Sequence, residues 1–113
     1  LFTSDGVVKR VDALDADADA FRERTHDRLV AELEWRVESY EEAIVNLLYE
    51  NEELVKRNAQ LDAQRANKSD EELREIDSKI TQNTTRMTTN ELQIEEHEEA
   101  RDVTRERLES LAN

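Results

Sequence analysis

Apolar residues recur along most of the chain at alternating spacings of three and four, in two separate stretches. The first stretch comprises Val30, Leu33, Val37, Tyr40, Ile44, Leu47, Asn51, Leu54, Asn58 and Leu61. The second comprises Leu73, Ile76, Ile80, Asn83, Met87, Asn90, Ile94, His97, Arg101, Thr104, Leu108 and Leu111. This is the heptad pattern of a coiled coil, with apolar a and d positions on one helix face. The pattern predicts an all-α fold of long helices that pack as a coiled coil.

The two stretches do not share one heptad register. Leu61 and Ile76 both occupy d positions, but the 15 residues between them are one more than two heptads. A continuous parallel rod absorbs such a break near residues 64–70 by unwinding locally. Alternatively the chain turns near Asn67 into an antiparallel hairpin, because Ser69-x-x-Glu72 is a capping box that starts a new helix. The rod is favoured, since no Gly or Pro marks a turn.

The chain therefore divides into four predicted parts. They are a non-helical segment at 1–10, a first coiled-coil segment at 11–66, a register break or turn at 67–72 and a second coiled-coil segment at 73–113. The non-helical prediction rests on Ser4-Asp5-Gly6, which is a turn signal. In the hairpin alternative we expect Asn51 to face Asn83.

Polar residues interrupt both apolar faces. Asn51 and Asn58 occupy a positions, and Asn83, Asn90 and His97 occupy d positions. A buried Asn costs stability unless its amide is satisfied, so it is retained mainly where it fixes register or the number of strands. All five are predicted to lie in the oligomer core as register-setting residues. Around a threefold axis, Asn83 and Asn90 are also candidates to hold water or an anion.

The segment Ile80-x-x-Asn83-Thr84 resembles a motif of the trimeric coiled-coil stalks of autotransporter adhesins and of some phage and viral fibres. Met87-x-x-Asn90-Glu91 is a second copy with Glu in place of Thr. The resemblance covers about two heptads. It implies a parallel homotrimer in which the Asn83 and Asn90 layers hold chloride-like anions.

The apolar face is wider in the first stretch than two strands require. Leu48 and Val55 occupy e positions and Val45 a b position, which favours three or more strands or contact with another helix. Trp35 and Tyr49 occupy outward f positions on one face. They are either isolated exposed aromatics or a docking patch for a partner protein.

Composition restricts the classes of partner. Charged residues make up 40% of the chain and the formal net charge is −13, so a nucleic-acid partner is excluded by the lack of clustered basic charge. The acidity fits solvated helix faces or, since basic residues are mostly Arg, a halophilic source. No run of about 18 apolar residues is present, so we expect no membrane insertion in this segment. The absence of Cys excludes disulfides and leaves the compartment open.

No nucleophile constellation, phosphate loop or metal cluster is recognisable, so we expect neither an enzyme nor a cofactor. The favoured function is a structural one, in oligomerisation and as a spacer. The chain would form a homotrimeric stalk or fibre segment of a virion appendage or cell-surface protein, outside the cell or on the virion surface. Its partners would be itself and other structural proteins at its ends. The alternative is a cytoplasmic coiled-coil hairpin or dimeric scaffold that binds other proteins, with Trp35 and Tyr49 as contacts.

Overall fold

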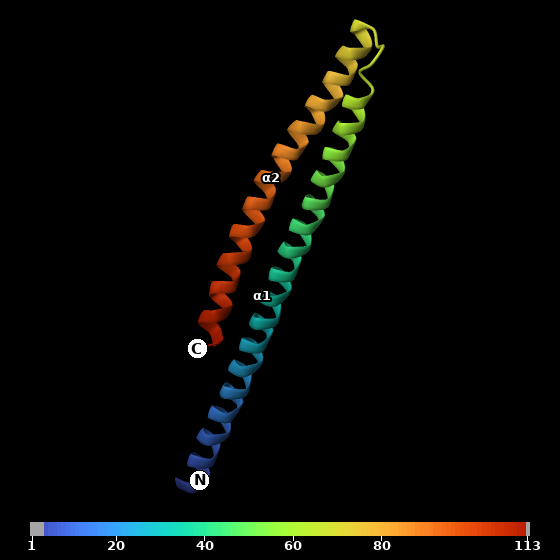
Figure 1. Ribbon diagram of the computed structural model, residues 1–113. Coiled ribbons are helices and arrows are strands. Elements are labelled where there is room, and N and C mark those ends of the chain that lie inside the picture. Colours follow the sequence, from blue (N-terminus) through green and yellow to red (C-terminus); the bar gives the residue numbers. More distant parts are fainter. Residues whose placement is uncertain (1–3, 113) are drawn as a thin grey trace.

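The fold consists of two long helices. The computed structural model describes residues 4–112, with side chains from residue 9 onward. Helix α1 spans Ser4–Ala63 and helix α2 spans Asp70–Ala112, with residues 64–69 between them (Figure 1). The molecule is extended, with principal dimensions of 101 × 24 × 14 Å. The predicted all-helical fold with two long helices is confirmed.

The length of the helices follows from what their sequences lack. Proline is absent from the chain and the one glycine, Gly6, lies near the start of α1, so no residue breaks either helix in its interior. Asp70, Glu71 and Glu72 form the first turn of α2. Carboxylates at this end are favoured by the positive end of the helix dipole.

The connection between the helices is a reversal of the chain without glycine. Helix α1 closes with a bond from the Gln64 amide to the Leu61 carbonyl, 3.1 Å long. Asn67 has a φ of 61°, in the left-handed region that Asn tolerates better than most residues. The predicted capping box then forms, because the Glu72 amide donates to Ser69 Oγ (3.2 Å) and the Ser69 amide to Glu72 Oε1 (3.4 Å). Asn67 thus adopts the backbone conformation for which glycine is the usual choice.

Helix α2 runs back alongside α1 (Figure 1). The single chain therefore has the arrangement of the hairpin alternative. Asn67 and the capping box at Ser69 stand where a turn would usually have Gly or Pro. The predicted break near 64–70 coincides with the turn.

The core is one narrow layer between the two helices. Its buried apolar side chains are Leu33, Ile44 and Leu54 from α1 and Ile76 and Ile94 from α2. Leu33, the most enclosed of them, is 2% exposed. Every a and d position of the two predicted stretches is at least partly buried, and almost all other positions of α2 are exposed. The heptad assignment is therefore confirmed.

The start of the chain differs from the sequence-based prediction. Residues 4–10 belong to α1, whereas they are predicted to be non-helical; residues 1–3 lie outside the described part. Ser and Asp are common at helix starts as well as in turns, because their side chains can accept a bond from a free backbone amide. The same residues, Ser4 and Asp5, therefore signal a turn in the sequence and lie at the start of a helix.

Candidate interaction surfaces

The four predicted core asparagines form two layers of amide pairs across the hairpin. Asn90 Nδ2 donates to Asn51 Oδ1 over 2.8 Å, and Asn83 Nδ2 donates to Asn58 Oδ1 over 2.9 Å. Asn51 Nδ2 in turn donates to the Met87 carbonyl at 3.3 Å. Asn90 is 4% exposed, so an unpaired amide there would be costly. Each layer finds its acceptor within the chain.

These pairs form in one particular register of the hairpin. Asn51 faces Asn90, one heptad beyond the Asn83 that sequence analysis expects. With that expected register Asn58 and Asn90 would each face an isoleucine, whereas the observed register pairs all four amides. The shift is possible because the connection runs alongside the first turns of α2 (Figure 1). There Arg65 Nη2 donates to Asp77 Oδ1 over 2.6 Å.

Two ion pairs flank the core at matching heptad positions. Glu50 and Arg86, both at g, are paired, and Glu41 and Arg105, both at e, are paired. In an antiparallel coiled coil g faces g and e faces e, whereas in a parallel one g faces e. These pairs are not among the residues predicted from the sequence, although opposite charges at like heptad positions of the two stretches indicate them.

Hydrogen bonds lower the pKa of two carboxylates of the hairpin, Glu50 and Glu72. The bond donated by Arg86 lowers the pKa of Glu50, and the bonds from Ser69 in the capping box lower the pKa of Glu72. A carboxylate with a lowered folded-state pKa stabilises the fold above the pKa of the unfolded chain, about 4.3. That stabilisation is lost as the pH falls through the lower folded-state value.

The double variant Glu50→Gln/Glu72→Gln is therefore expected to lose less stability on acidification than the parent chain. Thermal melts at about pH 6 and about pH 3 measure the difference. Glu38→Gln/Glu42→Gln, which removes two exposed carboxylates elsewhere on α1, is the control and should follow the parent. If both double variants lose the same amount, neither the Arg86 pair nor the capping box accounts for the acid sensitivity.

The two histidines lie apart. His97 is partly buried at its predicted d position, with its ring 6.0 Å from that of Tyr40 and tilted by 33°. His26 Nε2 lies 3.1 Å from the Leu111 carbonyl, at the end of α2. His97 therefore lies in the contact between the two helices, and His26 marks the place on α1 where α2 ends.

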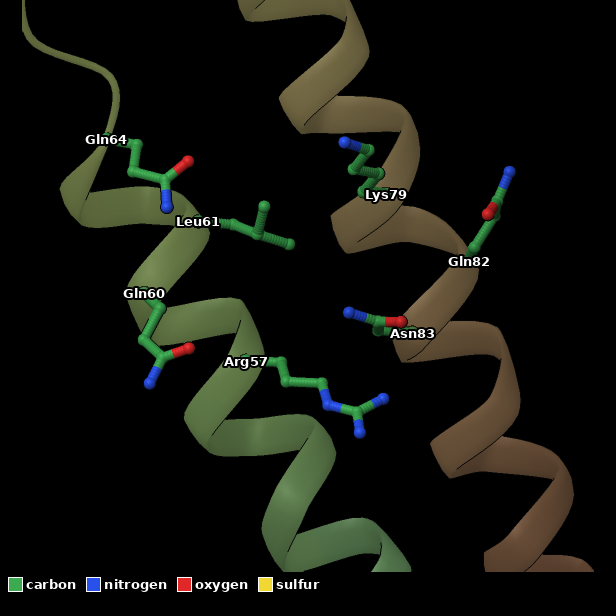
Figure 2. A pocket seen from close by; sticks show the side chains of 7 residues that line it. All are labelled: Arg57, Gln60, Leu61, Gln64, Lys79, Gln82 and Asn83. Carbon is green, nitrogen blue, oxygen red and sulfur yellow. The ribbon is translucent and has the colours of Figure 1, made fainter.

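A hollow of about 270 Å³ opens beside the Asn58–Asn83 layer. Its lining residues are Arg57, Gln60, Leu61, Gln64, Lys79, Gln82 and Asn83. Figure 2 shows Arg57 and Leu61 reaching from α1 toward Lys79 and Asn83 of α2. Arg57 and Lys79 occupy g positions that are level with each other. This g pair therefore has two positive charges, whereas the Glu50–Arg86 pair has opposite charges. An anion at Asn83 would find positive charge here, and such binding stays a prediction for both the Asn83 and Asn90 layers.

Exposed apolar side chains of α1 that α2 leaves uncovered form a set that we call the outer patch: Trp35, Val45, Leu48, Tyr49 and Val55. All five are exposed, Trp35 and Tyr49 each by 65%. They occupy b, e and f positions, which adjoin one another on a helix. Among the described side chains α2 has exposed large hydrophobic residues only at Leu92 and Val103. The hairpin thus leaves uncovered the extra width of the apolar face that the sequence indicates.

Helix α1 continues past the end of α2. Beyond His26, residues 9–25 form a segment that we call the arm, and it stands clear of α2 in Figure 1. Val11, Leu14 and Phe21 of the arm are exposed by 50%, 69% and 63%. A second helix packed beside the arm would bury these apolar side chains and so stabilise it.

No cluster of three or more His, Asp or Glu side chains placed to hold a metal ion is found among the described residues. Neither described helix has the length and apolar character needed to span a bilayer. The arrangement consists of polar core layers, flanking ion pairs and exposed apolar strips.

Comparison with known protein families, curated proteins and solved structures found no match to this chain. The likeness of the Asn83 and Asn90 segments to fibre stalks remains a resemblance of motif. Fold and surfaces together define the chain as a two-helix coiled coil with a protruding arm.

Proposed function

We propose that this protein is a non-enzymatic coiled-coil scaffold, in which the antiparallel hairpin is kept in the assembled protein and holds the outer patch toward a partner protein. The single observation that carries the proposal is the outer patch itself. Five exposed large apolar side chains occur between residues 35 and 55 of α1, in a chain that is otherwise dominated by charge. Exposed apolar side chains in such number are typical of interaction sites, and Tyr and Trp are enriched in them.

The core layers support the hairpin over a trimeric stalk. In a stalk, Asn83 and Asn90 would need partners from other chains. In the hairpin their amides are paired with Asn58 and Asn51, and like heptad positions carry opposite charges. The extended shape also serves the spacer role that both functions share, because 101 Å separates the ends of the molecule.

The surroundings of the outer patch indicate the chemistry of the partner. Exposed Glu34, Glu38 and Glu42 lie beside Trp35 on the same stretch of α1. Complementary charge around an apolar centre favours a partner helix with an apolar face and basic flanks. The partner class is therefore a basic amphipathic helix.

A synthetic amphipathic helix of Leu and Lys is expected to bind the hairpin and to shift the fluorescence of Trp35, the one Trp of the chain. Tyr49→Glu should weaken this binding about tenfold or more, because it places a charge inside the apolar contact. Leu92→Glu is the matched control, since it adds the same charge at an exposed apolar site on α2. Equal affinity of the two variants would mean that the peptide is held by net charge and would refute the outer patch as the site.

A further inference from the structure

The arm has its own apolar face, turned away from α2. Val11, Leu14, Ala18 and Phe21 repeat the spacing of three and four. From Phe21 to Val30, the first a residue of the face that packs on α2, there are nine residues, or about two and a half helical turns. The two apolar faces of α1 therefore point in opposite directions. A helix packed on the arm would not collide with α2.

We propose that the arm pairs with the arm of a second copy of this chain, antiparallel, to join two hairpins into an elongated homodimer. In the heptad frame of the arm, Val11 and Ala18 are a residues, and Leu14 and Phe21 are d residues. Antiparallel pairing that sets Ala18 level with Phe21 of the other copy places a opposite d throughout. It covers apolar surface that is exposed in the single chain.

The charges of the arm are self-complementary in this register. Asp15 and Arg22 both occupy e positions, and Asp17 and Arg24 both occupy g positions. In the proposed dimer Asp15 faces Arg22 of the other copy and Asp17 faces Arg24, each twice by symmetry. The hairpin also pairs opposite charges at like heptad positions, g with g and e with e, at an offset that differs by one heptad from that of the arm.

Parallel pairing of two arms is disfavoured by like charges in the contact. The d position after Phe21 is Arg28, which would face its own copy in a parallel pair. In the antiparallel pair Arg28 lies level with Val11, and its aliphatic stem can cover that side chain. Like charges at equivalent positions destabilise the wrong pairing and so set the orientation.

The state of association is the first test and does not involve the outer patch. The parent chain is expected to sediment as a dimer, and Leu14→Glu/Phe21→Glu as a monomer whose far-ultraviolet spectrum retains the helical hairpin. Leu92→Glu, which replaces an exposed apolar residue of α2 with the same charged residue, should remain dimeric. A parent that stays monomeric at about 1 mM, or that forms a trimer, would overturn the proposal.

Disulfide trapping then tests orientation, since the chain has no cysteine of its own. Val11→Cys and Arg28→Cys chains are mixed and oxidised. Antiparallel pairing predicts a mixed disulfide between the two variants, because the two positions are level across the dimer. Identical positions would lie about 26 Å apart, from 17 residues at about 1.5 Å each, beyond the reach of a disulfide. Disulfides between like variants without the mixed product would establish a parallel pair and refute the register.

Charge exchange provides a rescue that a mere folding defect could not imitate. Asp15→Arg/Asp17→Arg is expected to abolish the dimer, because four arginines would then face one another in each half. Adding Arg22→Asp/Arg24→Asp to the same chain should restore it. A quadruple variant that stays monomeric while the parent is dimeric would refute the e-to-e and g-to-g contacts.

Discussion

Asn90→Leu is expected to lower the free energy of unfolding by about 1–3 kcal/mol, although it replaces a polar core residue with an apolar one. The loss arises at Asn51, whose Oδ1 accepts the bond that Asn90 Nδ2 donates and would be left without it. Asn51 is itself partly buried, so water restores the bond only in part. Urea denaturation of the variant and parent at one protein concentration measures the difference.

The paired variant Asn51→Leu/Asn90→Leu distinguishes amide pairing from a simple intolerance of Leu at position 90. It removes both partners and adds apolar area, so it should be more stable than either single variant. If the double variant loses the sum of the two single losses, the two amides do not depend on each other. That result would contradict the paired layer.

Register is the property that the amide layers are expected to protect. Spin labels at Asn46 and Glu95, both exposed, report it within one chain diluted into unlabelled protein. The hairpin predicts a separation of about 10 Å between helix axes plus the labels, whereas a continuous helix would give about 74 Å for these 49 residues. With both layers replaced by Leu, the distribution should broaden by about 10 Å, the length of one heptad. A long distance in the parent would refute the hairpin in solution.

Leu54→Ala is expected to cost about 2–5 kcal/mol, a large part of the stability of a protein this size. Leu54 is 4% exposed and lies in a core only one layer thick. A cavity in such a core cannot be filled by a second layer of side chains behind it. Denaturant unfolding at fixed protein concentration gives the loss.

The neighbouring residue provides the control for that loss. Val55 is 57% exposed, so Val55→Ala should change stability by only about 0.5 kcal/mol or less. If the two alanine variants destabilise equally, residue 55 is covered in solution and another chain lies on the outer patch. If neither destabilises, the a and d layer is not the core.

Periodicity is the part of the fold that could be predicted from sequence. The alternation of three and four identified the a and d positions of both helices because burial on one face requires that spacing. The capping box at Ser69 located the start of α2, since free amides at a helix start need acceptors. The placement of Asn90 and His97 toward the core followed from the same spacing.

Register and connection could not be predicted in this way. Any two heptad stretches align at several offsets, and the choice of Asn90 over Asn83 as the partner of Asn51 depends on satisfying four amides together. The turn at Asn67 lacked a distinctive signal because one Asn in the left-handed region looks like any other Asn in sequence. The helical start near Ser4 was missed because capping and turn residues are the same types.

The open end of the hairpin determines how the molecule would respond to mechanical tension. Both helices have their free ends on the side away from the turn (Figure 1), and His26 Nε2 contacts the Leu111 carbonyl at the end of α2. Tension applied through those ends would peel α2 from α1 like a zipper, one heptad after another, rather than shear all layers at once. The two amide layers lie in the half of the hairpin nearer the turn, so they would separate late. A chain released before that point would close again in its original alignment.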